Sequence, residues 1–266
     1  MTVQDGWDPA QYNRFAAQRE QPFWDLVQLL APVTAPEVVD LGCGDGRLTG
    51  RLHEVLGAAG TLGVDSSPAM IADAQAHAGG ALRFRLGDIG AFGVDGRQDA
   101  DGPAGGYDIV FANASLQWVP DHRAVLRRWA GLLRPGGQLA VQVPSNADHP
   151  GHRLAAELGA ELLNEPPPDP VAEHVLPPEE YALELESLGF KAQHVRLQVY
   201  LHRLASTAEV VEWVKGTSLT RFKESFGDEG WPAFVDLYRA RLLATLGEHA
   251  PYVYAFKRIL MWGRLT

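Results

Sequence analysis

A short apolar run followed at once by three closely spaced glycines constrains the fold of this chain more than any other feature. Residues 37–46 read EVVDLGCGDG, which places glycines at positions 42, 44 and 46 directly after an expected strand. Glycine permits a tight turn and removes the Cβ atoms that would keep a ligand away from the backbone. In an open parallel sheet, ligands bind beyond the carboxyl ends of the strands. The stretch therefore predicts an α/β fold with a ligand site at the loop after its first strand.

Strand and helix patterns alternate between residues 37 and 144. Apolar runs predict strands at 37–41, 61–67, 82–88, 107–115 and 136–144. Apolar residues at helical spacing predict helices at 47–57, 68–79 and 121–133. Strands separated by helices imply a parallel sheet with right-handed crossovers.

A second pattern follows Pro144. Helices are expected at 152–163, in a segment that ends at 187–190, within 207–219, and from Trp231 to about Leu246. The proline-rich stretch at 164–170 predicts an extended linker, and alternating apolar residues predict two more strands at 191–204 and 253–265. The strands add up to a mostly parallel, seven-stranded sheet flanked by helices.

Composition excludes several classes of protein. The net charge of -10 argues against a nucleic-acid partner, because phosphate contacts need clustered Lys and Arg. Cys43 is the only cysteine, so the sequence holds no disulfide framework and no cysteine-based metal cluster. The first residues lack the pattern of a secretory signal, and no window approaches about eighteen consecutive apolar residues. We expect a cytosolic protein without a membrane partner.

The glycine motif differs from the dinucleotide fingerprint Gly-x-Gly-x-x-Gly, because its spacing is Gly-x-Gly-x-Gly with Asp40 two residues earlier. Residues 40–46 resemble the first motif of class I S-adenosylmethionine-dependent methyltransferases. Further signals of that family follow in order: Asp65 ends the second strand, Asp88 ends the third, and RPGG at 134–137 precedes the fifth. The resemblance implies a Rossmann-like class I methyltransferase fold and S-adenosylmethionine as the cofactor.

The same resemblance implies roles for single residues. Asp65 is expected to accept both ribose hydroxyls, Asp88 to contact the adenine amino group, and Asp40 to orient the amino group of the amino-acid part. The glycine loop and the start of the next helix are expected to face the cofactor carboxylate. The predicted cofactor set lies at or just beyond the ends of the first four strands: Asp40, Gly42, Cys43, Gly44, Gly46, Asp65, Ser66, Met70, Asp88, Ile89, Asn113 and Ala114. NAD binding, or a doubly wound domain whose glycines only form a turn, are the alternatives.

Four longer segments resemble the trans-aconitate methyltransferase family: residues 7–27, 111–126, 139–152 and 211–219. The resemblance implies a single methyltransferase domain over 1–266. Its parts would be an N-terminal helical cover (1–36), a cofactor-binding core (37–144), and cap helices with the last two strands (145–266). The sequence departs from the family in a long glycine-rich loop at 95–106 and at Asp45, where relatives often have proline.

The resemblance implies methylation of a carboxylate of trans-aconitate or a similar small polycarboxylic acid. A carboxylate with a pKa near about 4 is ionised at pH 7 and needs no general base, so no catalytic residue is expected. The chain must instead hold a small anionic substrate with cationic and aromatic donors. The predicted acceptor set is Tyr12, Arg14, Arg19, Gln117, Trp118, His122, Trp213 and Lys215.

Less specific interpretations exist for most of these residues. For Tyr12, Arg14 and Arg19 the alternative interpretation is a solvated helix face, and for Trp118 it is the hydrophobic core. Cys43 is expected to be a small filler, not a nucleophile. His149 and His152 have a spacing seen in metal sites, but no partner in pattern, so no metal is expected.

Two other functions remain open. One is a methyltransferase of the same fold that acts on a hydroxyl or on a carrier-bound acyl carboxylate; for a carrier, Arg123, Arg127 and Arg128 form the candidate basic patch. The other is a non-enzymatic module that binds the cofactor. The sequence does not indicate the oligomeric state.

Overall fold

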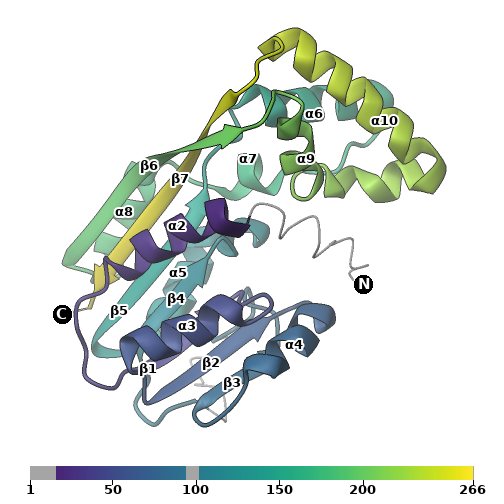
Figure 1. The fold of residues 1–266 in the computed structure, drawn as a ribbon. Coiled ribbons are helices and arrows are strands. Elements are labelled where there is room, and N and C mark those ends of the chain that lie inside the picture. Colours follow the sequence, from purple (N-terminus) through teal and green to yellow (C-terminus); the bar gives the residue numbers. More distant parts are fainter. Residues whose placement is uncertain (1–15, 94–101, 266) are drawn as a thin grey trace. The chain divides into compact units, whose positions relative to one another are not determined.

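The structure, a computed structural model, describes residues 16–93 and 102–265, with side chains from residue 20 onward within these ranges. The chain forms two compact units, whose elements are labelled in Figure 1. Of the described residues, unit 1 contains 16–20, 145–173 and 199–257, and unit 2 contains 21–144, 174–198 and 258–265. The predicted cofactor-binding core, 37–144, falls wholly within unit 2, and the single-domain organisation stays a prediction. Tyr12, Arg14 and most of the loop predicted at 95–106 lie outside the described residues.

A seven-stranded sheet has the strand order β3-β2-β1-β4-β5-β7-β6. Its strands are β1 (Glu37–Leu41), β2 (Gly60–Asp65), β3 (Leu82–Leu86), β4 (Tyr107–Asn113), β5 (Leu133–Pro144), β6 (Ala192–Leu204) and β7 (Tyr252–Arg264). The first five strands pair in parallel, whereas β7 runs antiparallel to β5. Strand order reverses between β1 and β4, and such a reversal is where ligands bind in sheets of this kind. The predicted mostly parallel seven-stranded sheet is confirmed.

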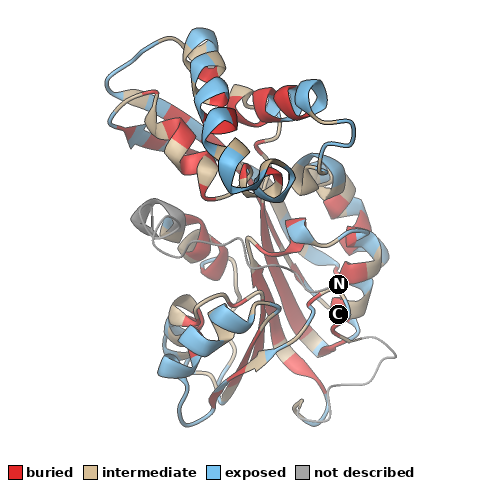
Figure 2. Cartoon of the chain, turned by 90° about the vertical axis from the view of Figure 1, so that its right-hand side faces the viewer, coloured by how far each residue is buried: buried red, intermediate tan, exposed pale blue. Residues whose placement is uncertain are grey.

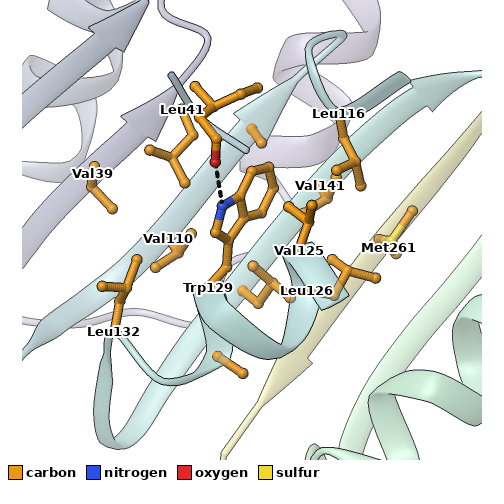
Figure 3. Close-up of a cluster of buried hydrophobic side chains, with 14 of the residues drawn as sticks. Val39, Leu41, Val110, Leu116, Val125, Leu126, Trp129, Leu132, Val141 and Met261 are labelled. Atoms are coloured by element: carbon orange, nitrogen blue, oxygen red, sulfur yellow. Dashed lines mark hydrogen bonds between the residues drawn. The ribbon is translucent and has the colours of Figure 1, made fainter. Parts of the chain in front are cut away.

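One face of the sheet in unit 2 is covered by α5 (His122–Ala130) and α8 (Pro178–Ser187), which pack on buried side chains of β1, β4 and β5. Figure 3 shows Trp129 of α5 among these side chains. Its indole Nε1 donates a hydrogen bond to the carbonyl of Ile89 at 3.1 Å. The helix thereby fixes the chain just beyond β3.

The opposite face is covered by α2 (Ala16–Val27), which packs the Phe23 ring against Phe111 of β4 at a centroid distance of 5.3 Å. The strands between the two helical layers are buried along much of their length, as Figure 2 shows. Strands covered on both faces read as continuous apolar runs, which explains why the sequence revealed them.

Helices α3 (Arg47–Leu56) and α4 (Pro68–Ala74) begin directly after the loops that follow β1 and β2. Ser67 caps α4, because its Oγ accepts a hydrogen bond from the Met70 amide at 3.3 Å. Pro68 then occupies the first helical position, where a missing amide hydrogen costs nothing. The short 3-10 helix η1 (Gln75–His77) continues α4, so the predicted helix at 68–79 is divided into two elements.

Unit 1 has its own hydrophobic core, to which the unit 1 portions of β6 and β7 contribute Leu204 and Tyr254. Its helices are α6 (Pro150–Leu162), the start of α7 (Pro170–His174), α9 (Glu209–Lys215), the 3-10 helix η4 (Thr220–Phe222) and α10 (Lys223–Leu246). Helix α6 enters this core through Leu154, Ala155 and Leu158.

Two predicted boundaries were wrong. Helix α10 begins at Lys223, well before Trp231, with a kink at Gly227, whose φ of 61° is not helical. Gly227 and Pro232 interrupt the pattern, which hid the earlier part of this helix. The predicted helix at 121–133 ends at Ala130, and Leu133 is already the first residue of β5. In residues 16–93 and 102–265, no helix has both the length and the apolar character needed to cross a membrane.

Candidate active site

The three glycines after β1 have different surroundings in the structure. All have a positive φ, but a Cβ at Gly42 would lie 2.1 Å from the Ser115 Cβ, and one at Gly46 would lie 2.8 Å from the Ala74 Cβ. Packing within the protein therefore requires glycine at positions 42 and 46. A Cβ at Gly44 would meet no atom of the described residues within 4 Å. Gly44 is the glycine that borders open space, where a ligand can approach the loop.

Neighbouring strand ends hold this loop in place. The amides of Gly42 and Cys43 donate to the Val64 carbonyl at 2.7 and 3.0 Å. Gly46 then caps α3 without offering a side-chain hydrogen bond to the first-turn amides. A helix N-terminus favours an anionic group, so the start of α3 fits the carboxylate of an amino-acid moiety.

Asp65 lies at the carboxyl end of β2 and is anchored through both carboxylate oxygens. Its Oδ2 accepts from the Gly44 amide at 2.9 Å, and its Oδ1 accepts from the Ser67 amide at 2.9 Å. Each carboxylate oxygen has a second lone pair, so the anchored group keeps capacity for two hydroxyl donors. This geometry fits the ribose contact that the resemblance implies. Ser66 is exposed and Met70 is half-buried just beyond it.

Asp40 is a buried carboxylate near the end of β1, with 4% of its surface exposed. The Thr49 hydroxyl on α3 donates to its Oδ2 at 2.5 Å. Burial raises the pKa of Asp40 to about 7, the Thr49 hydrogen bond opposes this rise, and the negative charge of Asp65 adds to it. A cationic group bound nearby would favour the ionised carboxylate, so this site fits an ammonium or sulfonium group.

Two buried amide oxygens lie at the end of β4. Asn113 Oδ1 and Gln117 Oε1 have no hydrogen-bond partner among the described residues. The Gln117 side chain is fixed by its other end, because its Nε2 donates to the Ala114 carbonyl at 2.6 Å. Ala114 has a φ of 55°, which is uncommon for a residue with a side chain and turns the chain sharply here. Buried acceptors are normally paired, so both oxygens fit a bound ligand with N–H or O–H donors.

The end of β3 provides a carboxylate that is exposed. Asp88 Oδ1 accepts from the Gly90 amide at 2.8 Å, which fixes the side chain and leaves the second oxygen for an external donor. Ile89 is buried, and its carbonyl accepts from Trp129. Cys43 is also buried. Burial, followed by the charges of Asp40 and Asp65, raises the pKa of its thiol far above the ordinary value, which makes it a neutral filler.

His122 is buried at the start of α5, and acceptor contact by this residue stays a prediction. Its ring is 2% exposed, and its Nδ1 lies 2.5 Å from the Tyr181 hydroxyl of α8. Burial lowers the pKa of His122 to about 4, so the ring is neutral at pH 7. His122 therefore connects α5 with α8. His174 lies near this ring, at a centroid distance of 6.3 Å, and its Nδ1 is 3.2 Å from the Gln117 carbonyl oxygen. No sequence pattern had indicated this residue.

The remaining acceptor predictions fall into several environments. Trp118 follows β4, and 44% of its surface is exposed. In unit 1, Trp213 is 2% exposed and stacks on His202 at a centroid distance of 4.8 Å, while Lys215 is half-buried at the end of α9. Arg19 lies on α2, and its side chain is outside the described part. Acceptor contact by these residues stays a prediction.

The positive charge of the candidate carrier patch on α5 is partly offset. Arg123 pairs with Glu180 at 2.6 Å and with Glu184 at 3.1 Å, and Arg127 lies 3.8 Å from Glu184. Arg128 donates to the neutral Gly90 carbonyl at 2.5 Å and keeps its charge. The patch as a basic surface for a carrier stays a prediction. No group of three or more His, Cys, Asp or Glu side chains in the described ranges could hold a metal ion.

Comparison with known proteins agrees with this geometry. Residues 38–137 match the family described as Methyltransferase domain. A protein from Deinococcus radiodurans named Trans-aconitate 2-methyltransferase is 38% identical over 260 residues, which cover 96% of each chain. A protein of the same name from Streptomyces avermitilis is 37% identical over 264 residues, covering 95% of this chain and 94% of the relative.

Solved structures share the fold. Phosphoethanolamine N-methyltransferase 2 from Haemonchus contortus, in complex with phosphomonomethylethanolamine and S-adenosylhomocysteine, matches with a TM-score of 0.59. The sequence identity is 14%, and the match covers 100% of this chain and 61% of that chain. At this identity the likeness concerns the fold alone.

The different surroundings of Gly42 and Gly44 predict different losses of stability when alanine replaces them. Gly42→Ala combines a left-handed φ with a clash against Ser115, so it should lower the free energy of unfolding by about 2 to 5 kcal/mol. Gly44→Ala meets no atom and should cost only about 1 to 2 kcal/mol of backbone strain. Urea unfolding of the two variants measures the difference, and equal losses would contradict the assignment.

Buried His122 predicts a pH dependence of stability. The folded pKa lies near 4, below the ordinary value of 6.5, so unfolded chains take up a proton that folded chains do not. Stability should therefore fall as the pH drops from about 6.5 toward 4, by up to about 1.4 kcal/mol per pH unit from this residue. His122→Phe should reduce that slope in urea unfolding at pH 7, 6 and 5. An unchanged slope would show that His122 titrates alike in both states.

Proposed function

The chain belongs to the trans-aconitate 2-methyltransferase family, and from this membership we propose that it methylates a carboxylate of trans-aconitate or a similar small polycarboxylic acid. It is an S-adenosylmethionine-dependent methyltransferase with the Rossmann-like class I fold that the sequence predicted. The observation that supports the acceptor most directly is the extent of the similarity. It covers 96% of the chain and so includes residues far outside 38–137, where methyltransferases differ according to their acceptors.

The residues of unit 2 fit the cofactor in charge and in hydrogen-bonding capacity. S-adenosylmethionine, when bound, supplies a methyl group activated by a sulfonium. Asp40 and Asp65 provide negative charge for a cationic ligand, and Asn113 Oδ1 and Gln117 Oε1 provide acceptors without competing partners among the described residues. The anchored loops fix these groups before binding, which reduces the entropy lost on association.

A carboxylate acceptor explains why no catalytic base is expected. The acceptor is ionised at pH 7, so the protein needs to orient it, exclude water and balance its charge. The neutral thiol of Cys43 and the buried ring of His122 are accordingly not required for proton transfer. Among the acceptor predictions whose side chains the structure describes, Trp118 and Lys215 have partly exposed surface.

Methyl transfer to a panel of acids tests the acceptor. The protein is incubated with methyl-labelled S-adenosylmethionine and trans-aconitate, cis-aconitate, citrate or isocitrate, and products are identified by mass. A monomethyl ester formed chiefly from trans-aconitate is the expected result. Turnover of a hydroxyl compound or a carrier-bound acid alone would favour another acceptor. Cofactor binding without any turnover would favour a non-enzymatic module.

Asp65→Ala tests the placement of the cofactor. Loss of the anchored carboxylate should weaken S-adenosylmethionine binding by about 1.5 to 3 kcal/mol, measured by isothermal titration calorimetry. Asp73→Ala, which removes an exposed carboxylate of α4, is the matched control and should leave the affinity unchanged. If Asp65→Ala stays folded and binds the cofactor as tightly as the parent protein, the ribose assignment is wrong.

A further inference from the structure

Two buried glutamines on one face of β5 differ in how completely their side chains are paired. Gln138 and Gln142 are both 0% exposed, and residues i and i+4 of a strand lie on the same face. Gln138 Oε1 accepts from the Ala31 amide at 2.7 Å and from the Trp262 indole at 2.8 Å, and its Nε2 donates to the Ala31 carbonyl at 2.9 Å. Gln142 Nε2 has no partner in the described part of the chain. The glutamine nearer the carboxyl end of β5 is thus the incompletely paired one.

A contact with Arg258 fixes the orientation of the Gln142 amide. Arg258 lies on β7 and is 6% exposed, and its Nη1 donates to Gln142 Oε1 at 3.1 Å. A guanidinium only donates, so the amide atom that faces it must be the oxygen. The two N–H groups of Nε2 are therefore left for another partner. Buried donors are normally paired, so a bound ligand with an acceptor oxygen fits this position.

Gln142 lies beside the residues that end β4. It is the register partner of Asn113, and its carbonyl accepts from the Ala114 amide at 2.9 Å. Register partners on neighbouring strands place their side chains on the same face of a sheet. On that face Phe111 of β4 packs against Phe23 of α2. All of these residues belong to unit 2, and Gln142 lies near the strand ends where ligands bind in sheets of this kind.

The position of β5 and the chemistry of an N–H donor both favour the methyl acceptor as the partner of Gln142. Gly44, Asp65 and Asp88, which fit the cofactor, lie at or just after the ends of β1, β2 and β3, whereas β5 lies on the other side of β4. Gln142 Nε2 offers only donors, so it fits an oxygen and not the sulfonium or amino group of the cofactor. A carboxylate oxygen is the stronger choice, because hydrogen bonds to a charged acceptor are about twice as strong as neutral ones.

We propose that Gln142 binds the acceptor, with its Nε2 donating to a carboxylate oxygen while its Oε1 stays on Arg258. The inference rests on the proposed function, since it assumes a carboxylic acceptor. A hydroxyl acceptor would form only the weaker neutral hydrogen bond, so the contact favours acids. The competing explanation is a direct bond from Gln142 Nε2 to Asn113 Oδ1, which also has no partner within residues 16–93 and 102–265.

Gln142→Glu is the decisive variant, because it removes the donors and keeps the contact within the fold. It preserves the size of the side chain and an oxygen for Arg258, and it replaces the N–H groups with a second oxygen. We expect the KM for trans-aconitate to rise about 10- to 100-fold, as loss of a hydrogen bond to a charged group implies, with the Kd for S-adenosylmethionine within about threefold of the parent. Gln142→Met has a similar size and no N–H group, so it should raise the same KM and decides the question if the Glu variant does not fold.

Gln138→Glu makes the same change on the same face of β5 and is the matched control. It removes the donation to the Ala31 carbonyl, so it should lower the free energy of unfolding and leave the acceptor KM unchanged. A folded Gln142→Glu variant with an unchanged KM for trans-aconitate overturns the proposal and favours the bond to Asn113. A Kd for S-adenosylmethionine raised as much as the acceptor KM overturns it as well, because Gln142 would then contact the cofactor.

Direct binding separates this inference from the proposed function. If the parent protein methylates none of the acids, calorimetry with trans-aconitate is run on the parent and on Gln142→Glu in the presence of S-adenosylhomocysteine. Binding that the variant weakens at least about tenfold would support the Gln142 contact although the proposed reaction had failed. Binding of equal strength, or no binding to the parent, would overturn the contact. Turnover of trans-aconitate with an unchanged KM in the variant would overturn the contact alone.

Discussion

The backbone of residues 42–44 is held between two neighbouring strand ends, and the geometry of the cofactor site depends on this contact. On one side, the Val64 carbonyl and the Asp65 carboxylate accept hydrogen bonds from the loop amides. On the other side, Ser115 leaves no room for a side chain at Gly42, and its hydroxyl donates to the Leu41 carbonyl at 2.5 Å. The ends of β1, β2 and β4 are thus joined by short polar contacts. A ligand that meets Gly44 therefore meets Asp65 and the residues after β4 in fixed positions.

A buried carboxylate sets the carboxyl end of β1 apart from the apolar face that α5 and α8 cover. Buried hydrophobic side chains line the sheet face that α5 and α8 cover. The indole Nε1 of Trp129 on α5 donates a hydrogen bond to the Ile89 carbonyl there. Asp40 instead is a carboxylate in an almost fully buried position, supported by one hydroxyl from Thr49. Such a group destabilises the protein on its own, and a cationic ligand compensates the cost. This relation between stability and binding is typical of functional sites.

Asp40, Asn113 and Gln117 in unit 2 offer acceptor oxygens to a ligand. A cationic cofactor with N–H and O–H donors needs such an environment. The pairing of Arg123 with Glu180 and Glu184 offsets part of the positive charge that an acidic carrier protein would need on α5.

The sequence by itself determined the parallel sheet, the ligand loop and the position of Asp65, because strand and helix periodicities and the glycine spacing are local properties of the chain. It did not separate the packing glycines 42 and 46 from Gly44, since the difference lies in Ser115, Ala74 and Phe84, which are distant in sequence. The burial of His122 against Tyr181, and of Trp213 against His202, was hidden for the same reason. His152 attracted notice only for its spacing from His149, whereas Asp169 and Arg221 carried no signal. Only the tertiary structure decided that Asp169 and Arg221 form a buried ion pair, and that the buried His152 ring has no partner among the described residues, because burial and partners are properties of the neighbours that folding brings together.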